Sequence, residues 1–254
     1  MKLATWNVNS LNVRLPHVLT WLEQQKPDVL CLQETKQEDS KFPYQILQEA
    51  GYIAVHNGQK TYNGVAILSR HGLSDIQMDI PGYADEQKRI VAATIQGIRV
   101  ICAYIPNGQS VDSEKYQYKL EWLNALVDWL KIEMAHYPKL ALLGDYNIAP
   151  EDRDCHDPVA WQGQVLVSDP ERLVFQRMLD LGLYDSFRLF EQAGGSYSWW
   201  DYRMAAFRRN LGLRIDHILV SAALKTASHA CYIDKAPRKL ERPSDHAPVV
   251  LELK

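Results

Sequence analysis

Short apolar runs that end in a carboxylate or an amide recur along this chain. The runs and the polar residues that follow them are Leu3–Trp6 with Asn7, Val29–Leu32 with Glu34, and Leu140–Leu143 with Asp145 and Asn147. Such runs are typical of buried strands. A carboxylate beside a core is costly unless something cationic neutralises it, and one such acid alone is more often a cap or half of an ion pair. Because strand ends in a sandwich meet at one rim, their recurrence predicts a site there.

Two further acids extend the pattern. Asp216 lies inside the apolar run 213–220, and Asp245 with His246 precedes the run 249–253. His246 is a candidate base, and Asp216 is the acid that we expect to orient its imidazole. The alternative is that His246 is a hydrogen-bonded turn residue before Pro248. Oxygen ligands of this kind suit a hard cation, Mg²⁺ or Mn²⁺.

Strands and helices alternate over the whole length. Predicted strands cover 2–8, 29–32, 52–57, 64–69, 90–95, 98–105, 140–143, 213–221 and 249–253, and predicted helices cover 15–22, 43–50, 123–134 and 171–181. Gln96-Gly97 separates two of the strands and predicts a hairpin. No Gly/Ser-rich linker interrupts the pattern, so we expect residues 1–254 to form a single α/β sandwich domain. The segment 150–170 is loop-like, which predicts either function or disorder.

Composition limits the partners and the compartment. The 28 Lys and Arg against 31 Asp and Glu give a formal charge of −3, so any polyanion must be bound by a local basic face. The four cysteines (Cys31, Cys102, Cys155 and Cys231) are scattered and form no zinc or disulfide pattern. The first residues carry no secretion signal and no run of about 18 apolar residues spans a membrane. We therefore expect a cytoplasmic protein without a membrane partner.

Five motifs follow one another along the chain: WNVNS at 6–10, PDVLCLQETK at 27–36, GDYNIAP at 144–150, GLRID at 212–216 and SDHAP at 244–248. Together they resemble the exodeoxyribonuclease III/AP endonuclease family, within the endonuclease/exonuclease/phosphatase superfamily. Each is a weak pattern alone, but five in family order over nearly the whole chain are very specific. The resemblance implies a four-layered α/β sandwich, with two central mixed β-sheets flanked by helices and the active site at one rim.

The resemblance also implies roles for the rim residues. Glu34 corresponds to the principal metal ligand with Asn7 beside it, while Asp245 corresponds to a second or alternative metal position. Asp145 is similar to the aspartate that activates or positions the attacking water, and Asn147 to the residue that orients it; both also stand near the metal. His246 resembles the histidine that contacts the target phosphate, and Asp216 resembles the acid that holds this histidine. Tyr104 resembles the tyrosine near the scissile phosphate. Asp145 and the Asp216–His246 pair compete as the water-activating base, and we favour Asp145.

Other matching segments imply double-stranded DNA with abasic or 3′-end lesions as the partner. Trp199 and Leu213 correspond to residues that form a small apolar pocket for a base-free sugar in this family. The alternative is that Trp199 and Trp200 are aromatic residues of the core. Arg203, Arg208, Arg209 and Arg214, joined to Lys60, Arg89 and Lys119, predict a phosphate track, although solvated loop charge is the usual meaning of such a run. The loops at Asn9-Ser10 and 62–64 meet the DNA backbone in this family. Leu166 either wedges into DNA or packs.

The function expected from this pattern is divalent-metal-dependent hydrolysis of DNA 5′ to abasic sites and at 3′ termini, by a monomer. The balance between abasic-site incision, 3′-to-5′ exonuclease and 3′-end cleaning stays open, because the segment 155–168 falls where family members differ. Two alternatives remain: a superfamily phosphoesterase that acts on inositol phosphates or sphingomyelin, and a non-catalytic DNA-binding module. The joint presence of Glu34, Asp145, Asn147, Asp216 and His246 disfavours the module.

Overall fold

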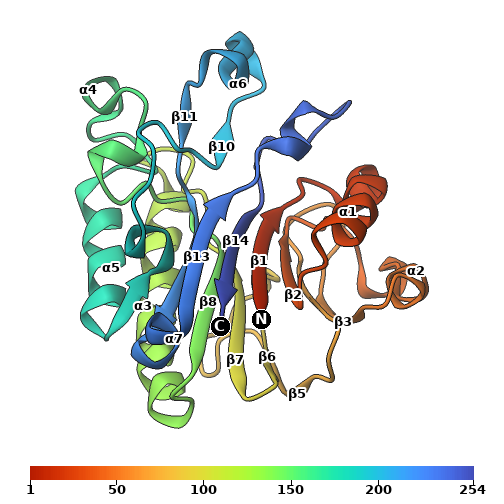
Figure 1. The fold of residues 1–254 in the computed structure, drawn as a ribbon. Coiled ribbons are helices and arrows are strands. Elements are labelled where there is room, and N and C mark those ends of the chain that lie inside the picture. Colours follow the sequence, from red (N-terminus) through yellow and green to blue (C-terminus); the bar gives the residue numbers. More distant parts are fainter.

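Two six-stranded β-sheets form the centre of the computed structural model, which describes all residues from 1 to 254 (Figure 1). The first sheet has the strand order β13-β14-β1-β2-β4-β3. Its strands are β1 (Lys2–Asn7), β2 (Val29–Gln33), β3 (Ile53–Asn57), β4 (Val65–Ser69), β13 (Ser228–Ile233) and β14 (Val249–Leu253). Strands β1 and β2 are parallel and β14 is antiparallel to β1.

The second sheet has the order β5-β6-β7-β8-β12-β9. Its strands are β5 (Ser74–Met78), β6 (Ile90–Ile95), β7 (Ile98–Tyr104), β8 (Leu140–Asp145), β9 (Leu183–Asp185) and β12 (Asp216–Ser221). Strands β7 and β8 are parallel, and β12 is antiparallel to β8. A separate two-stranded ribbon, β10 (Trp199–Trp200) with β11 (Gly212–Leu213), extends beyond the sheets together with α6 (Figure 1).

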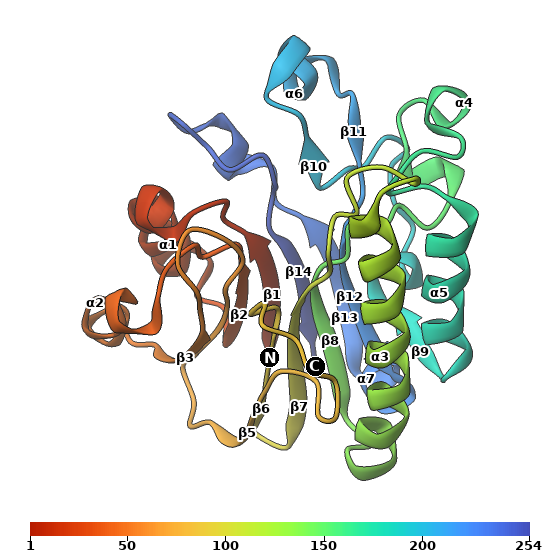
Figure 2. The same cartoon turned by 180° about the vertical axis from the view of Figure 1, so that it is seen from behind.

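Helices cover the outer face of each sheet (Figures 1 and 2). Helices α1 (Leu11–Gln25) and α2 (Tyr44–Glu49) pack on the first sheet, while α3 (Glu114–His136) and α5 (Asp169–Asp180) pack on the second. The shorter helices are α4 (Pro158–Trp161), α6 (Ala206–Arg209) and α7 (Ala222–Ala227), with 3₁₀ turns at Asp39–Lys41, Asp152–Asp154, Ser186–Leu189, Arg203–Ala205 and Ala236–Lys239. This is the four-layered α/β sandwich that the sequence predicts.

The largest buried cluster, of 22 apolar residues, lies between the two sheets. Alternate residues of the central strands face it, as Val29 and Cys31 do in β2, while their neighbours Leu30 and Leu32 face α1 and α2. Both faces of these strands are therefore covered, which explains why their sequences are continuous apolar runs and not alternating ones. No helix is both long enough and apolar enough to cross a membrane.

The strand directions bring the polar strand ends to one rim. The carboxyl ends of the parallel pairs β1–β2 and β7–β8 point the same way, and the antiparallel β12 and β14 begin where those pairs end. Asn7 ends β1, Tyr104 ends β7, Asp145 ends β8 and Asp216 begins β12. Because both sheets share this rim, side chains from either sheet meet above the core.

The sequence locates most of the central strands and helices but misplaces one strand. The expected strand 213–221 is wrong, because the chain changes partner at Arg214 and Ile215. Leu213 pairs with Trp199 in the ribbon, whereas Asp216 pairs with Asp145 in the second sheet. Asp216 therefore begins a strand at the rim instead of lying inside one. The segment 150–170 is ordered and contains α4, and β5, β9, β10, β13 and α7 were not anticipated.

Gly144 gives a direct test of the β7–β8 pairing that supports the rim. A Cβ at this position would lie 1.8 Å from the Ala103 carbonyl oxygen. We expect Gly144→Ala to lower the free energy of unfolding by about 3 kcal/mol, because the backbone of β7 must move to admit the methyl group. Urea denaturation followed by tryptophan fluorescence measures this. Gly72→Ala is the matched control, since nothing lies within 4 Å of a Cβ added at Gly72. Equal stability of the two variants would contradict the pairing.

Candidate active site

Asn7 joins the two sheets at the rim. Its side-chain amide donates to Glu34 Oε1 at 2.9 Å and to Asp145 Oδ2 at 2.8 Å. Glu34 follows β2 in the first sheet and Asp145 ends β8 in the second, so one amide holds a carboxylate from each sheet. The side-chain Oδ1 of Asn7 accepts from the backbone N–H of Asn9, which fixes the direction of the side-chain amide. The strand-end pattern therefore does converge in space.

The backbone around these carboxylates is in an unusual conformation. Glu34 has φ +52° and Asn147, two residues after Asp145, has φ +50°. Non-glycine residues in this region cost of order 1–3 kcal/mol and persist only where the surroundings enforce them. The Asn147 backbone N–H donates to Asp145 Oδ1 at 2.9 Å. These turns aim the two carboxylates at each other.

His246 and Asp216 form the expected pair. Nδ1 of His246 lies 2.9 Å from Asp216 Oδ2, and Nε2 lies 3.7 Å from Asp145 Oδ2. The Ser198 hydroxyl donates to Asp216 Oδ2 at 2.6 Å and anchors the acid. Burial alone would lower the pKa of His246, but the carboxylates of Asp216 and Asp145 raise it to about 10. The imidazole is therefore protonated at neutral pH, and the turn-residue interpretation does not explain its contacts.

The pKa of Asp145 lies closer to neutral pH than that of His246. Burial raises the pKa of its carboxyl to about 7, and the nearby Asp216 adds to the rise against the opposing charge of His246. The largest effect is desolvation, which disfavours the anion. A carboxyl with this pKa is a better base at neutral pH than an exposed one.

The donor set fits a divalent cation. Ligand atoms of Glu34, Asp145 and His246 all lie within 4.8 Å of one another. Glu34 and Asp145 offer carboxylate oxygens, which suit a hard divalent cation, and His246 offers a ring nitrogen only when its imidazole is neutral. Four carboxylates lie at this rim, those of Glu34, Asp145, Asp216 and Asp245; Lys36 pairs with Glu34, and the His246 ring lies against Asp216 and Asp145. A bound dication would add positive charge there and would favour the ionised form of Asp145.

Asp245 and Asn147 lie beside this group but make other contacts. Asp245 accepts from Asn9 Nδ2 at 3.0 Å and from Trp199 Nε1 at 2.9 Å. Burial would raise the pKa of Asp245, but His246 and these two hydrogen bonds lower it below its usual value. The Asn147 side chain donates to the Ile105 carbonyl at 2.9 Å and accepts from Asn107 Nδ2 at 3.0 Å.

Tyr104 lies next to Asp145 across the β7–β8 pair. Burial and the carboxylate of Glu34 raise the pKa of its phenol well above the usual value, so the hydroxyl stays protonated and can donate. The Arg89 guanidinium stacks on its ring, with the guanidinium carbon 4.8 Å from the ring centre. Tyr104 and Arg89, which are both expected near the substrate, are therefore in contact.

The residues expected to bind DNA are divided between surface and interior. Lys60, Arg203 and Arg208 are exposed, and Asn9 and Trp199 are half-buried. Arg203 pairs with Asp201 at 2.6 Å, so part of its charge is already compensated. Trp200 is fully buried and donates to Asn210, which makes it the core aromatic of the pair.

Three of the residues expected to contact DNA have buried side chains. Lys119 is completely buried, pairs with Glu171 and donates to the Asn147 carbonyl at 2.6 Å. Arg214 is buried between Asp154 and Asp185. Leu213 has no exposed surface and belongs to an apolar cluster with Leu166, against which Trp199 packs. Leu166 therefore packs and does not project as a wedge.

Two residues in the site had no predicted role. Lys36 donates to Asn9 Oδ1 at 2.7 Å and pairs with Glu34 Oε2 at 2.9 Å, and Ser198 anchors Asp216. Lys36 lies two residues after Glu34, so its position is a usable signal, since a lysine that close to a half-buried carboxylate can pair with it. Nothing in the sequence marks Ser198.

Comparisons with known proteins agree with this geometry. Residues 4–246 match the model of the Endonuclease/Exonuclease/phosphatase family. Exodeoxyribonuclease III of Haemophilus influenzae is 38% identical over 268 residues, with all of both chains covered. A Neisseria structure titled 3′ phosphatase NExo, bound to a product DNA hairpin, has a TM-score of 0.99 at 51% identity, covering 100% of this chain and 99% of that one. An AP endonuclease structure from Archaeoglobus fulgidus has a TM-score of 0.96 at 39% identity, with 100% and 99% covered.

The buried position of Lys119 predicts a structural effect on mutation. We expect Lys119→Met to lower the free energy of unfolding by about 3–5 kcal/mol, because Glu171 is left as an unpaired buried charge. Adding Glu171→Gln should restore part of that loss. Chemical denaturation measures both variants. Exposed Lys60→Gln is the control and should leave stability within about 0.5 kcal/mol. A stable Lys119→Met protein that instead shows a flatter salt dependence of DNA binding would return Lys119 to the phosphate track.

Proposed function

The chain belongs to the endonuclease/exonuclease/phosphatase family and is a DNA-repair nuclease, and we propose that 3′ ends of duplex DNA are its main substrate. The reaction is hydrolysis of the phosphoester at a blocked or ordinary 3′ terminus. The observation that carries the hydrolytic assignment is the meeting of Glu34, Asp145 and the imidazolium of His246 within 4.8 Å. Neither sheet alone supplies this group.

Asp145 is the water-activating residue in this proposal. Its buried carboxylate lies at the centre of the polar group at the rim, and the backbone N–H of Asn147 orients it. His246, with a pKa of about 10, is a poor acceptor of a further proton. We therefore assign His246 to the target phosphate, where its positive charge stabilises the developing negative charge, with Asp216 as its positioning residue. Asn7, Asn147 and the Tyr104 hydroxyl complete the polar surroundings.

We propose Mg²⁺ or Mn²⁺ as the cofactor, with Glu34 and Asp145 as its ligands and Asn7 holding the two carboxylates together. When bound, such an ion supplies Lewis-acid stabilisation of the phosphoryl oxygens and lowers the pKa of the attacking water. Lys36 holds the outer oxygen of Glu34. Asp245, whose two oxygens accept from Asn9 and Trp199, positions those residues.

The preference for 3′ ends rests on Leu213. A base-free sugar bound against Leu213 needs an open apolar pocket, but this side chain is 0% exposed. Leu166 belongs to the cluster that covers it, and we infer that Leu166 occupies the space of the sugar pocket. A 3′-phosphate terminus places no sugar beyond the reacting phosphate and does not require that space. The Neisseria relative at 51% identity is titled a 3′ phosphatase.

Incision 5′ to abasic sites is the second candidate activity. The relatives include an AP endonuclease, and Trp199 is half-buried and not closed off. A base-free sugar stacked on Trp199 alone would be held more weakly than one enclosed on two sides. The monomeric state, the cytoplasmic location and the single domain over residues 1–254 stay predictions.

A panel of duplexes tests the proposal. We expect Mg²⁺-dependent removal of a 3′-phosphate and digestion of a recessed 3′ end to exceed incision at an abasic analogue, with all activity lost in chelator. Asp145→Asn should lower turnover by about 10²–10⁴-fold while DNA binding persists. Gel analysis of product sizes separates the three reactions. Faster abasic incision would refute the 3′-end preference, and full turnover by Asp145→Asn would refute its role.

Leu166→Gly tests the closed pocket. Leu166 has φ +78°, which glycine adopts without strain, so the backbone should tolerate the change. Loss of the side chain should expose Leu213 and raise abasic incision relative to 3′-phosphate removal by about tenfold, the size expected for a gained apolar contact. The ratio of the two rates in one preparation is the measurement. Val167→Ala, in the same cluster, is the control. An unchanged ratio in Leu166→Gly would remove Leu166 as the barrier.

A further inference from the structure

Three polar side chains outside the reaction centre form a line of contacts that leads from the surface to the residue after Glu34. Nε2 of His56 lies 2.8 Å from Thr35 Oγ1, and Nδ1 of His56 lies 2.7 Å from Asp39 Oδ1. His56 lies in β3, and Asp39 begins the 3₁₀ turn Asp39–Lys41. The Thr35 and His56 side chains are buried, whereas that of Asp39 is 58% exposed. The Asp39–His56–Thr35 group therefore connects the surface with the backbone next to Glu34.

The turn that contains Glu34 has an unfavourable backbone conformation on both sides of Thr35. Glu34 has φ +52° and Lys36 has φ +53°. Non-glycine residues keep such angles only where the surrounding structure holds them. The direction of the Glu34 side chain depends on this turn, because the backbone sets where the Cα–Cβ bond points. Contacts that hold Thr35 therefore also hold the Glu34 carboxylate.

Backbone hydrogen bonds hold Thr35 from two directions. Its N–H donates to the Gly64 carbonyl at 3.1 Å, and its carbonyl accepts from the Leu11 N–H at 3.0 Å. The first bond comes from the loop between β3 and β4, and the second from the start of α1. The contact of the Thr35 hydroxyl with His56 adds an attachment to β3, which is a third direction.

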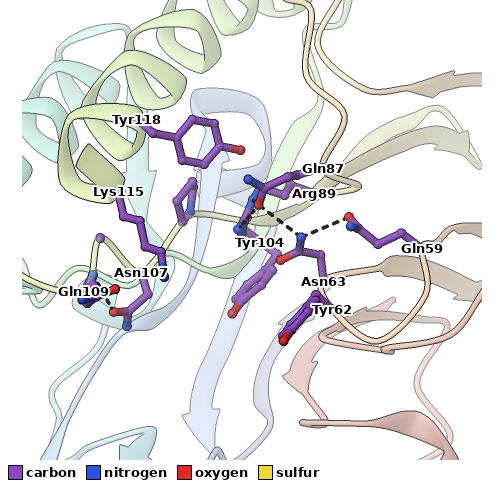
Figure 3. Close-up of a pocket in the computed structure, with 12 residues that line it drawn as sticks. Gln59, Tyr62, Asn63, Gln87, Arg89, Tyr104, Asn107, Gln109, Lys115 and Tyr118 are labelled. Carbon is purple, nitrogen blue, oxygen red and sulfur yellow. Dashed lines mark hydrogen bonds between the residues drawn. The ribbon is translucent and has the colours of Figure 1, made fainter. Parts of the chain in front are cut away.

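The loop between β3 and β4 is itself fixed. The Asn63 amide donates to Gln59 Oε1 at 3.0 Å and to Gln87 Oε1 at 3.2 Å (Figure 3). These three side chains line a cavity of about 660 Å³ beside Tyr104. The Asn63 carbonyl accepts from the Lys36 N–H at 2.9 Å. The strained turn is therefore attached to a loop that is tied to the segment before β6.

The His56 ring has little freedom to move. The Phe42 ring stacks on it, with the ring centres 4.1 Å apart and the planes at 22°. Gly58 lies against its edge, because an added Cβ there would come within 2.1 Å of His56 Cε1. The Gly58 N–H also donates to Asp39 Oδ1 at 2.9 Å, which holds the carboxylate beside the ring. The imidazole is therefore a rigid link between Asp39 and Thr35.

The His56 ring is neutral at the working pH. Burial lowers its pKa to about 4, although the Asp39 carboxylate acts in the opposite direction. A neutral imidazole has one N–H and one lone pair. The carboxylate beside Nδ1 favours the proton on that nitrogen, so Nε2 accepts from the Thr35 hydroxyl. Each member of the group then has a defined donor or acceptor role.

A carboxylate, an imidazole and a hydroxyl in this order are also the parts of a nucleophilic hydrolase site. The Thr35 side chain is 0% exposed, so no substrate reaches its hydroxyl. Gly64 covers it closely, since an added Cβ at Gly64 would lie 2.1 Å from Thr35 Oγ1. The group therefore acts through the backbone and not as a nucleophile.

We propose that Asp39, His56 and Thr35 are positioning residues that hold the Glu34 carboxylate in place for a divalent cation. This proposal rests on the proposed function, in which Glu34 and Asp145 bind the ion. With the group intact, the turn is already in its binding conformation, so little of the free energy of metal binding is lost in ordering it. Without the Thr35 hydroxyl, the turn can relax and the ion must order it. The expected result is weaker metal binding with little change in turnover at saturating metal.

Thr35→Val tests the group, because valine is branched like threonine but has no hydroxyl. We expect the Kd for Mn²⁺, measured without DNA by electron paramagnetic resonance of the free ion, to rise by about tenfold, as for other residues that support metal ligands. The kcat at saturating Mn²⁺ should stay within about threefold, since the ligands themselves are unchanged. Thr35→Ser keeps the hydroxyl and should bind Mn²⁺ within about twofold of the unaltered protein. An unchanged Kd in Thr35→Val, or an equal rise in Thr35→Ser, would overturn the proposal.

Asp39→Asn provides a second test if Thr35→Val folds poorly, because Asp39 is largely exposed. Loss of the carboxylate removes the preference for a proton on Nδ1 of His56, so the Kd for Mn²⁺ should rise by about threefold. Thr94→Val is the matched control, since it makes the same substitution in β6, where the hydroxyl has no hydrogen-bond partner. It should leave the Kd unchanged. A rise in Thr94→Val as large as that in Thr35→Val, or variants of the group that melt earlier but bind Mn²⁺ normally, would show only a structural role and overturn the proposal.

Glu34→Gln separates this proposal from the proposed function. If Glu34→Gln binds Mn²⁺ as tightly as the unaltered protein, Glu34 is not a ligand and the cofactor part of the proposed function fails. If Glu34→Gln weakens binding but Thr35→Val and Asp39→Asn do not, only the positioning role fails.

Discussion

The hydrogen bonds of one amide, Asn7, depend on the packing of two separate sheets. Asn7 and Glu34 come from the first sheet and Asp145 from the second, and the amide reaches both carboxylates only because the 22-residue cluster sets the distance between the sheets. A one-residue slip of β8 would turn Asp145 to the opposite face, since strand side chains alternate. The pairing of Asp145 with Tyr104 on one side and Asp216 on the other fixes that register. The geometry of the reaction centre is thus a property of the core.

Three basic side chains hold the segment after Asp145, and two of them, Lys119 and His217, are buried. Lys119 donates to the carbonyl of Asn147, His217 to that of Ile148 at 2.8 Å, and Arg172 to that of Ala149 at 3.1 Å. Burial lowers the pKa of His217 to about 4, so its neutral ring donates from Nε2 while Nδ1 accepts from Arg214. Three consecutive carbonyls therefore have fixed donors, which explains how Asn147 persists with φ +50°. These three side chains support the site through the backbone of this segment.

The sequence predicts the residues at strand ends far better than it predicts the exposure of charged residues. Glu34, Asp145, Asp216 and His246 converge as expected, because apolar runs locate strands and strand ends share a rim. Lys119 and Arg214 instead pair with Glu171 and Asp154, which are 52 and 60 positions away. A basic residue with few acids near it in the sequence is expected to be exposed. Glu171 and Asp154 reach Lys119 and Arg214 only in the folded chain. The burial of Leu213 was not predictable for the same reason, because the residues that cover it come from the 150–170 segment, which carries no regular pattern.

The net charge of −3 includes an acidic region and a basic region that lie side by side. The rim holds the carboxylates of Glu34, Asp145, Asp216 and Asp245, which suit a dication, whereas the adjoining cavity is lined by Arg89 and Lys115 and by no carboxylate. A uniformly basic surface would bind DNA more tightly but would offset the negative charge that a dication would need. A uniformly acidic one would repel the substrate. Within about 10 Å charges of opposite sign act on each other with little screening, so the two regions can each attract an ion of opposite charge only because they are kept apart. Arg89 between two tyrosine rings keeps positive charge at that boundary without pairing with the catalytic carboxylates.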